Sequence, residues 1–353
     1  MKIYFVVKEP SERTINHFVD SLGKALEAQG CEVVYGLERL WTDDVQTCDI
    51  VHFQWPEYIF GAQKKVFSDN DVKRVRQRLS TLKEKGIKIF LQIHNLKPHT
   101  NTDKGVLQVY DVFYQYADVM VHMGRYSLEL LEPKYPNVHH VVVPHHIYDN
   151  ILTFTESQQN ARRKLKLPED KKIVLSFGKF RDDKEREFVL ALRKRFDHSV
   201  LFLMPGFYRE TLHTWNPKKL VGRLYHTLRY KLKGIRFSND VIPDELMQCY
   251  FCAADVVLIQ RLDILNSGNL PMAFAAGKVV VGPRVGNVGG ILEETGNFMF
   301  NPTDMDSAIM AVREALKTSE TSRGTQNKKY AEEYWSSAVI AKMIIEKYKM
   351  DIK

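Results

Sequence analysis

The chain has 353 residues, of which 44% are hydrophobic and 27% are charged, a composition that excludes a disordered chain and is typical of a folded protein of two domains. No apolar run approaches the roughly 18 residues that a membrane-spanning helix needs. The formal net charge of +8 fits an anionic substrate, an anionic membrane surface or nucleic acid, and solubility alone would also explain it.

The first ten residues, MKIYFVVKEP, hold a short apolar run and lack a small-residue cleavage site, which predicts a first strand and not a signal peptide. Four cysteines in a chain of this length favour a reducing compartment, so we expect a cytoplasmic protein. Cys249 and Cys252 form a CxxC pair with no second pair beside it. Their helical spacing predicts two core-facing side chains and not a metal or redox site.

The first half of the chain alternates short β-rich runs with segments of helical periodicity. This alternation predicts βαβ units and a parallel sheet, whose strands all end at the edge where ligands bind. One predicted helix, at 72–85, is strongly basic on its polar face. The predicted strands are residues 2–7, 31–36, 49–53, 87–93, 117–123 and 139–146, and the predicted helices are 14–29, 72–85, 106–116 and 127–131.

The second half repeats the pattern after a polar, charged segment at 153–170, which we interpret as a linker. We therefore predict an α/β protein with two Rossmann-like, doubly wound parallel-sheet domains, residues 1–155 and 156–326. The predicted strands are 171–178, 199–206, 255–260 and 279–281, and the predicted helices are 185–196, 242 onward, 266–276, 305–316 and 328–350.

Several motifs occur in a recognisable order along the chain: HFQWPE (52–57), IHNLKPH (93–99), VVVPHHIYDN (141–150), FGKFRDDKE (177–185), VIPDELMQCYFCAADVVLIQ (241–260), LDILNSGNLPMAFAAGKVVVGPR (262–284) and GILEETGNFMFNPTD (290–304). Together they resemble the GT-B glycosyltransferases, closest to the family-4-like (group 1) members, over nearly the whole length. The resemblance implies an acceptor-binding first domain that faces a nucleotide-sugar donor domain across a cleft. It also implies a C-terminal helix, 327–353, that packs back toward the first domain.

The motif at 177–185 places basic residues at the end of a predicted strand. A diphosphate leaving group becomes more negative as its bond to the sugar breaks, and fixed cations stabilise that charge where no metal does so. The resemblance implies a basic residue just after the glycine and a lysine about five residues further on. Lys179 and Lys184 match these positions as catalytic residues; the first is usually arginine, and Arg181 could take that role in donor binding. A solvated turn with paired charges is the alternative interpretation.

Residues 262–290 open with small residues before an apolar predicted helix that ends at Gly277. Backbone N–H groups at a helix start attract anions, so we expect the donor diphosphate to bind there. An ordinary N-cap by one of the same residues is the alternative, and it is compatible with anion binding. The predicted donor-binding residues are Asn266, Ser267, Gly268 and Asn269.

Two positions in this stretch depart from the resembled family, whose members carry two glutamates eight positions apart. This chain has Ile264 and Met272 there, and neither side chain can hydrogen-bond a ribose or sugar hydroxyl. The ribose contact is therefore unassigned. Glu293 or Glu294 could replace it, and a solvent-facing role near a helix start is the other interpretation.

The glycine-rich segment 284–290 is interpreted as a flexible loop that lines the donor sugar through Gly286, Asn287 and Gly289. A mere connection between strand and helix is the alternative. Residues 237–243 are expected near the nucleotide base, and the sequence does not distinguish uracil from guanine.

In the first half, several histidines lie at the ends of predicted strands, at the ligand edge of the sheet. We predict His94 to be catalytic, through a bond to the transferred sugar or through proton transfer, and His52, Glu57 and His145 to bind acceptor. Each histidine taken singly is more often structural. If the reaction inverts the anomeric centre, Glu57 or Asp103 is the candidate base; if it retains it, the leaving phosphate takes the acceptor proton.

The segment 215–237 (WNPKKLVGRLYHTLRYKLKGIRF) combines a leucine stripe with many cations. This composition fits an interfacial helix on an anionic membrane, and a surface helix packed by its leucines fits equally well. Nucleic acid is not expected as a partner, because aromatic interleaving is sparse and no recognition motif occurs.

These observations predict a metal-independent glycosyltransferase, without a cofactor, that moves a sugar from a UDP- or GDP-sugar to a saccharide or a lipid-linked saccharide in polysaccharide or glycoconjugate assembly. It would be cytoplasmic or peripheral at the inner membrane face. Two rival hypotheses are a nucleotide-sugar epimerase of the same fold and a non-catalytic glycan- or membrane-binding protein, the latter motivated by Ile264 and Met272.

Overall fold

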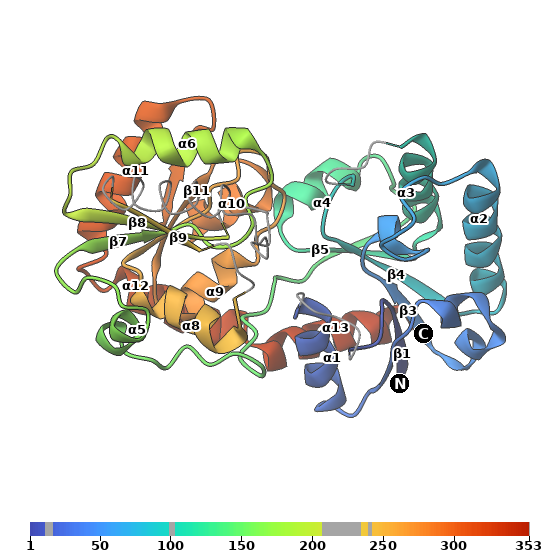
Figure 1. The fold of residues 1–353 in the computed structure, drawn as a ribbon. Helices are drawn as coiled ribbons and strands as arrows, with labels where there is room; N and C mark the ends of the chain where they lie inside the picture. The colour runs from blue at the N-terminus through green and yellow to red at the C-terminus, as the bar shows by residue number, and fades with distance from the viewer. Residues whose placement is uncertain (11–16, 99–102, 207–233, 239–241, 353) are drawn as a thin grey trace, which may run out of the picture. The chain divides into compact units, whose positions relative to one another are not determined.

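The computed structural model describes residues 1–10, 17–98, 103–206, 234–238 and 242–352, which form two compact units (Figure 1). Unit 1 comprises Met1–Ile151 and Tyr334–Lys353, and unit 2 comprises Leu152–Glu333. The boundaries expected from the sequence were after residues 155 and 326. Among the helices within the described ranges, none is long and apolar enough to cross a bilayer.

Unit 1 contains a fully parallel six-stranded sheet in the order β2-β1-β3-β4-β5-β6. Its central strands are rich in Val, Ile and Phe and are buried on both faces, as a parallel sheet between helices requires. The chain adds β2 on one side of β1 and then β3 on the other, so the strand order reverses between β1 and β3. The strands are β1 (Lys2–Val6), β2 (Glu32–Val34), β3 (Ile50–Phe53), β4 (Lys88–Ile93), β5 (Val119–His122) and β6 (His139–Val142).

Helices from both ends of the chain pack on this sheet. α13, the C-terminal helix, lies against α1, and its Tyr348 is fully buried with the hydroxyl 2.7 Å from Nδ1 of His52 in β3. The helices are α1 (Phe18–Glu27), α2 (Asp69–Glu84), α3 (Lys104–Tyr116), α4 (Arg125–Leu131) and α13 (Ser337–Ile352), with 3₁₀ turns η2 (Glu38–Trp41), η3 (Asp43–Thr47) and η4 (Pro56–Tyr58).

The single C-terminal helix that the sequence predicted at 328–350 is wrong, because the segment forms α12 (Arg323–Tyr334) and α13. The break has a tertiary cause. The backbone N–H of Ser337 donates to Asp149 Oδ1 at 2.8 Å, and the N–H of Ile147 donates to the carbonyl of Trp335 at 3.0 Å. Both contacts tie the break to the segment that precedes Ile151.

Unit 2 also contains a fully parallel sheet, in the order β12-β11-β10-β7-β8-β9. This is the Rossmann strand order, in which two strands, β8 and β9, lie on one side of the first strand, β7, and three, β10, β11 and β12, lie on the other. The reversal lies between β7 and β10, which are adjacent. The strands are β7 (Lys172–Leu175), β8 (Val200–Pro205), β9 (Ile235–Ser238), β10 (Val256–Leu258), β11 (Val279–Pro283) and β12 (Phe298–Phe300).

One face of this sheet is covered by α6 and α11 (Figure 1). Phe188 and Val189 of α6 and Val312 of α11 form one buried cluster with Val174 of β7 and Val256 of β10. The helices of unit 2 are α5 (Gln158–Lys164), α6 (Asp183–Arg193), α8 (Asp244–Ala253), α9 (Asn269–Ala275), α10 (Gly286–Glu294), α11 (Met305–Thr318) and α12.

The predicted flexible loop at 284–290 is wrong. Residues from Gly286 onward form α10, and Gly286, Asn287 and Gly289 are all buried. Gly286 has φ of +58°, and a Cβ there would lie 2.2 Å from the carbonyl oxygen of Ile264. Gly286 is therefore required because the backbone packs closely at this helix start. A flexible loop would be equally rich in glycine, so composition alone does not distinguish the two structures.

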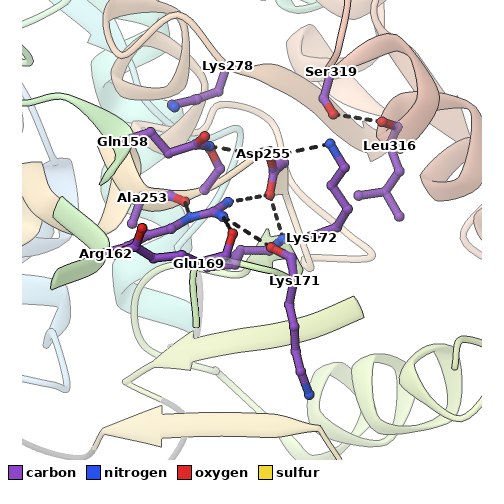
Figure 2. Close-up of polar contacts among 12 residues, drawn as sticks. Gln158, Arg162, Glu169, Lys171, Lys172, Ala253, Asp255, Lys278, Leu316 and Ser319 are labelled. Carbon is purple, nitrogen blue, oxygen red and sulfur yellow. Dashed lines mark hydrogen bonds and ion pairs between the residues drawn. The ribbon is translucent and has the colours of Figure 1, made fainter. Parts of the chain in front are cut away.

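A buried ion pair between Arg162 and Asp255 lies at the amino-terminal ends of β7 and β10, and Figure 2 shows its polar contacts. Asp255 Oδ2 accepts from Arg162 Nη2 at 2.7 Å and from the N–H of Ile173 at 2.6 Å, and Gln158 Nε2 lies 3.3 Å from Oδ1. Arg162 and Gln158 belong to α5, which lies inside the predicted linker 153–170. That segment is thus partly helical and anchored to unit 2 by this network.

Candidate functional site

The loop from Ser176 to Asp182 connects β7 to α6 at the carboxyl edge of the unit 2 sheet. Gly178 has φ of +91°, which allows the chain to turn sharply as it leaves the strand. Phe180 is fully buried and fixes the loop to the core. Lys179, on one side of Phe180, is therefore exposed, and Arg181, on the other side, is partly exposed.

The start of α6 organises this loop. Asp182 caps the helix through Oδ1, which accepts from the N–H of Glu185 at 2.9 Å. The carboxylate of Glu185 is buried, and it accepts from the N–H of Arg181 at 2.7 Å and from Arg261 Nη1 at 3.2 Å. Arg261 Nη2 also donates to the carbonyl of Lys179 at 3.1 Å. The two arginines and the loop backbone are thus connected through one carboxylate.

Arg261 is a site residue that the sequence reasoning missed. It comes directly after the predicted strand 255–260, so its position at a strand end was the signal that could have identified it. Burial and the nearby positive charge of Arg261 lower the pKa of Arg181 to about 10. Both causes disfavour a second positive charge at this loop, so an anion bound beside these two arginines would be electrostatically favourable.

Lys184 lies in the first turn of α6 and is exposed. The structure thus brings the predicted Lys179, Arg181 and Lys184 to one strand end and adds Arg261 from the neighbouring strand. The place where these cations gather is the point at which the strand order reverses, which is where open α/β sheets bind ligands.

The predicted anion cradle at 266–269 has a different local structure. α9 begins only at Asn269 and has seven residues, and its N-cap is Gly268, which supplies no side-chain cap. Asn269 Nδ2 donates to the carbonyl of Phe177 at 2.8 Å, and Asn266 Oδ1 accepts from Asn287 Nδ2 at 2.8 Å. These side chains connect the 266–269 segment to the β7 loop and to α10; Ser267 and Gly268 stay predicted donor-binding residues.

Both departures from the family pattern lie in the interior: Ile264 is 5% exposed and Met272 is 8% exposed. Glu293 and Glu294 do not stand near a helix start, because they are the last two residues of α10. α10 starts at the carboxyl edge of the sheet and runs back about 13 Å over its nine residues. This position argues against a ribose contact by either glutamate.

In unit 1, His94 directly follows β4. Its ring stacks on Trp55 with centroids 4.3 Å apart, and it meets Phe18 edge-on at 4.8 Å. Nε2 of His94 lies 2.8 Å from Oε1 of Gln54, which follows β3 on the adjacent strand. The predicted catalytic histidine is therefore held in a defined orientation at the carboxyl edge of the sheet.

The predicted acceptor-binding residues occupy more enclosed positions. His52 is fully buried, and burial lowers its pKa to about 3. Glu57 is 8% exposed and accepts a hydrogen bond from the hydroxyl of Tyr110 at 2.5 Å, and burial raises the pKa of its carboxyl. The position of His52, in contact with Tyr348, favours packing over acceptor binding.

His145 also makes two intramolecular contacts. Its Nδ1 donates to the carbonyl of His146 at 2.7 Å, and its Nε2 accepts from the hydroxyl of Tyr148 at 3.2 Å. Burial lowers the pKa of His145 to about 4. Asp103, a candidate base, caps α3 by accepting from the N–H of Val106 at 3.1 Å. Both residues therefore have structural partners in unit 1.

No cluster of three or more His, Cys, Asp or Glu side chains that could hold a metal occurs within the described ranges. Cys249 and Cys252 are buried free thiols in α8. The predicted membrane-binding segment 215–237 lies outside the described residues, apart from 234–237. Of the stretch expected near the base, 237–243, residues 239–241 also lie outside them.

Two doubly wound parallel sheets, with a group of cations at the reversal point of the second, define a two-domain α/β protein of the doubly wound class. No protein-family model matches the sequence, and no curated protein matches it. Solved structures do match. Sucrose-phosphate synthase from Thermosynechococcus elongatus superposes with a TM-score of 0.73 at 17% identity, over 99% of this chain and 98% of that one.

Two further structures resemble the chain over 99% of its length. Anabaena HepE in complex with UDP-glucose has a TM-score of 0.70 at 12% identity and is covered over 100% of its length. The catalytic domain of starch synthase IV from Arabidopsis thaliana, bound to ADP and acarbose, has a TM-score of 0.70 at 10% identity and is covered over 99%. At these identities the likeness establishes the fold, and it confirms the predicted GT-B class.

Proposed function

We propose that this protein is a glycosyltransferase that moves a hexosyl group from a nucleotide-diphosphate sugar to a saccharide or lipid-linked acceptor. The observation that carries the proposal is the group of four cations at the reversal point of the unit 2 sheet. The donor-bound state of HepE and the nucleotide-bound state of starch synthase IV, both of this fold, support it. The four cations are Lys179, Arg181, Lys184 and Arg261.

The chemistry that these cations would perform is stabilisation of the departing diphosphate. When the bond between the anomeric carbon and the phosphate oxygen breaks, the electron pair stays on the diphosphate, and fixed positive charges lower the energy of that state. Glu185 keeps Arg261 and the backbone of Arg181 in place, so the charges need little reorganisation during the reaction. They would act without a metal in this proposal.

Nucleotide binding is the first test. A ligand at about 100 times its dissociation constant stabilises the folded state by about 2.7 kcal/mol, which for a unit of this size raises Tm by about 5–10 °C. We expect such a shift with UDP, GDP or ADP at millimolar concentration. The absence of a shift with every nucleotide would reject the site. Conversion of the donor without any acceptor would instead favour an epimerase.

The second test is Lys184→Ala. Lys184 is exposed at the start of α6, so we expect the variant to fold with an unchanged Tm. Removal of one stabilising cation should lower kcat by about 100-fold, the size seen when a single oxyanion donor is lost. The matched control is Lys194→Ala, which removes an exposed lysine just after the other end of the same helix. Equal turnover in the two variants would reject the role of Lys184.

A further inference from the structure

We propose that Gln54 is a positioning residue that fixes the tautomer of His94. Gln54 is the first residue after β3, and His94 is the first residue after the neighbouring β4. The two side chains therefore meet at the carboxyl edge of the unit 1 sheet. The catalytic consequence rests on the proposed function, whereas the tautomer itself can be measured without any turnover.

The contact has a defined donor and acceptor. Oε1 of Gln54 has lone pairs and no proton, so the 2.8 Å contact requires His94 to donate from Nε2. A neutral imidazole carries only one ring proton, so Nδ1 then holds the lone pair. Nδ1 is therefore the atom of His94 that can accept a hydroxyl hydrogen or a proton.

The imidazole is also fixed in orientation. Trp55 stacks on the ring at an interplanar angle of 17°, and Phe18 approaches it at 82°. A ring held on its face and at its edge cannot exchange its nitrogens by flipping without disturbing both aromatic contacts. Tautomer and orientation together determine which ring nitrogen of His94 carries the proton and which carries the lone pair.

The contact with His94 uses only the oxygen of the Gln54 side-chain amide, and the amide nitrogen is buried. The side chain is 1% exposed, and Nε2 is buried with no hydrogen-bond partner among the residues that the structure describes. An unpaired buried donor is destabilising, and such groups in folded proteins call for an explanation. An apolar side chain at this position would avoid the cost, so the presence of glutamine here supports a role in orienting His94.

Gln92 offers a matched control. It lies in β4, two residues before His94, is 3% exposed, and donates from Nε2 to the carbonyl of Val121 at 3.0 Å. It is thus a buried glutamine of the same unit with a purely backbone partner. Gln92→Met removes a similar volume of polar atoms and leaves the contact between Gln54 and His94 in place.

The experiment is a long-range ¹H–¹⁵N correlation NMR measurement on the full chain with ¹⁵N-labelled histidine at neutral pH. In the unmodified protein we expect His94 to be protonated at Nε2. Gln54→Met should raise the proportion protonated at Nδ1 about fivefold, which corresponds to the loss of one hydrogen bond. Gln54→Glu keeps an acceptor and should restore the Nε2-protonated form, and Gln92→Met should leave it unchanged.

Donor turnover supplies the second readout. Gln54→Met should lower kcat at least about fivefold with donor KM within about twofold, since a positioning defect affects the reacting geometry more than ground-state binding. A His94 protonated at Nδ1 in the unmodified protein, or a tautomer ratio indifferent to Gln54→Met, overturns the proposal. Failure of nucleotide binding would leave the NMR result intact and would reject only the proposed function.

Discussion

Asp255 provides the sharpest test of what stabilises unit 2. Its carboxylate sits at the amino-terminal ends of β7 and β10 (Figure 2), where Arg162 and the N–H of Ile173 both donate to Oδ2. The side chains of Arg162 and Asp255 are 7% and 10% exposed. Asp255→Asn keeps the shape and removes the charge, so that Arg162 becomes a buried cation without a counter-ion.

The magnitude follows from burial. Breaking a buried ion pair by neutralising one partner costs about 3–5 kcal/mol, because the remaining charge keeps its desolvation penalty. Arg162 retains bonds to the carbonyls of Ala253 and Glu169, at 3.0 and 3.1 Å, which places the expected loss nearer to about 3 kcal/mol. For a unit of this size that loss lowers Tm by about 6–12 °C.

Urea unfolding followed by circular dichroism measures this difference. The control is Glu314→Gln, which removes the exposed ion pair with Lys317, where the Lys317 side chain is 73% exposed and the Glu314 side chain 55% exposed. We expect this control to change the unfolding free energy by less than about 0.5 kcal/mol. The nucleotide-induced rise in Tm should survive in Asp255→Asn, because the network lies at the edge opposite the candidate site. If Asp255→Asn lowers the unfolding free energy by less than about 1 kcal/mol, Arg162 is not a buried cation that depends on Asp255 as its counter-ion.

Two further predictions concern acid and packing. Burial lowers the pKa of four histidines of unit 1, namely His52, His122, His145 and His146, below 6.5. As the pH falls, the unfolded chain therefore binds more protons than the folded chain, and the stability that is present above pH 6.5 is lost toward pH 4. Between pH 7.5 and 5.5 we expect the unfolding free energy to fall by about 5 kcal/mol; a fall below about 1 kcal/mol would contradict the neutral, buried state. Gly286→Ala should destabilise unit 2 by about 2–4 kcal/mol, since its Cβ would lie 2.2 Å from a carbonyl oxygen. Gly290→Ala in the same helix, with open space around it, should be neutral or stabilising in the same unfolding assay.

Periodicity predicted the two parallel sheets well, because strand and helix signals depend on neighbours in sequence. The β-branched runs at 87–93 and 171–178 contain β4 and β7, with ends shifted by a few residues. Small residues were harder to interpret. The segment 284–290 has the composition of a loop, and only contact with Ile264 shows that Gly286 begins a helix.

The site shows the same division. Chain order was sufficient to place Lys179, Arg181 and Lys184 at a strand end, because the motif and the strand are contiguous. It could not predict that Arg261 lies beside them. Arg261 contacts the carbonyl of Lys179, which is 82 positions earlier in the chain and follows a different strand. Strand order is a property of the folded sheet and is not encoded in local spacing.

What the sequence determined by itself was therefore the alternation of strands and helices, and with it the fold class and the edge at which ligands bind. Only the tertiary structure decided which side chains at that edge are accessible and which are buried. His52 and His94 both end predicted strands, yet one is enclosed by α13 and the other stacks on Trp55 at the sheet edge. Burial depends on which elements cover a residue, and those elements come from distant parts of the chain.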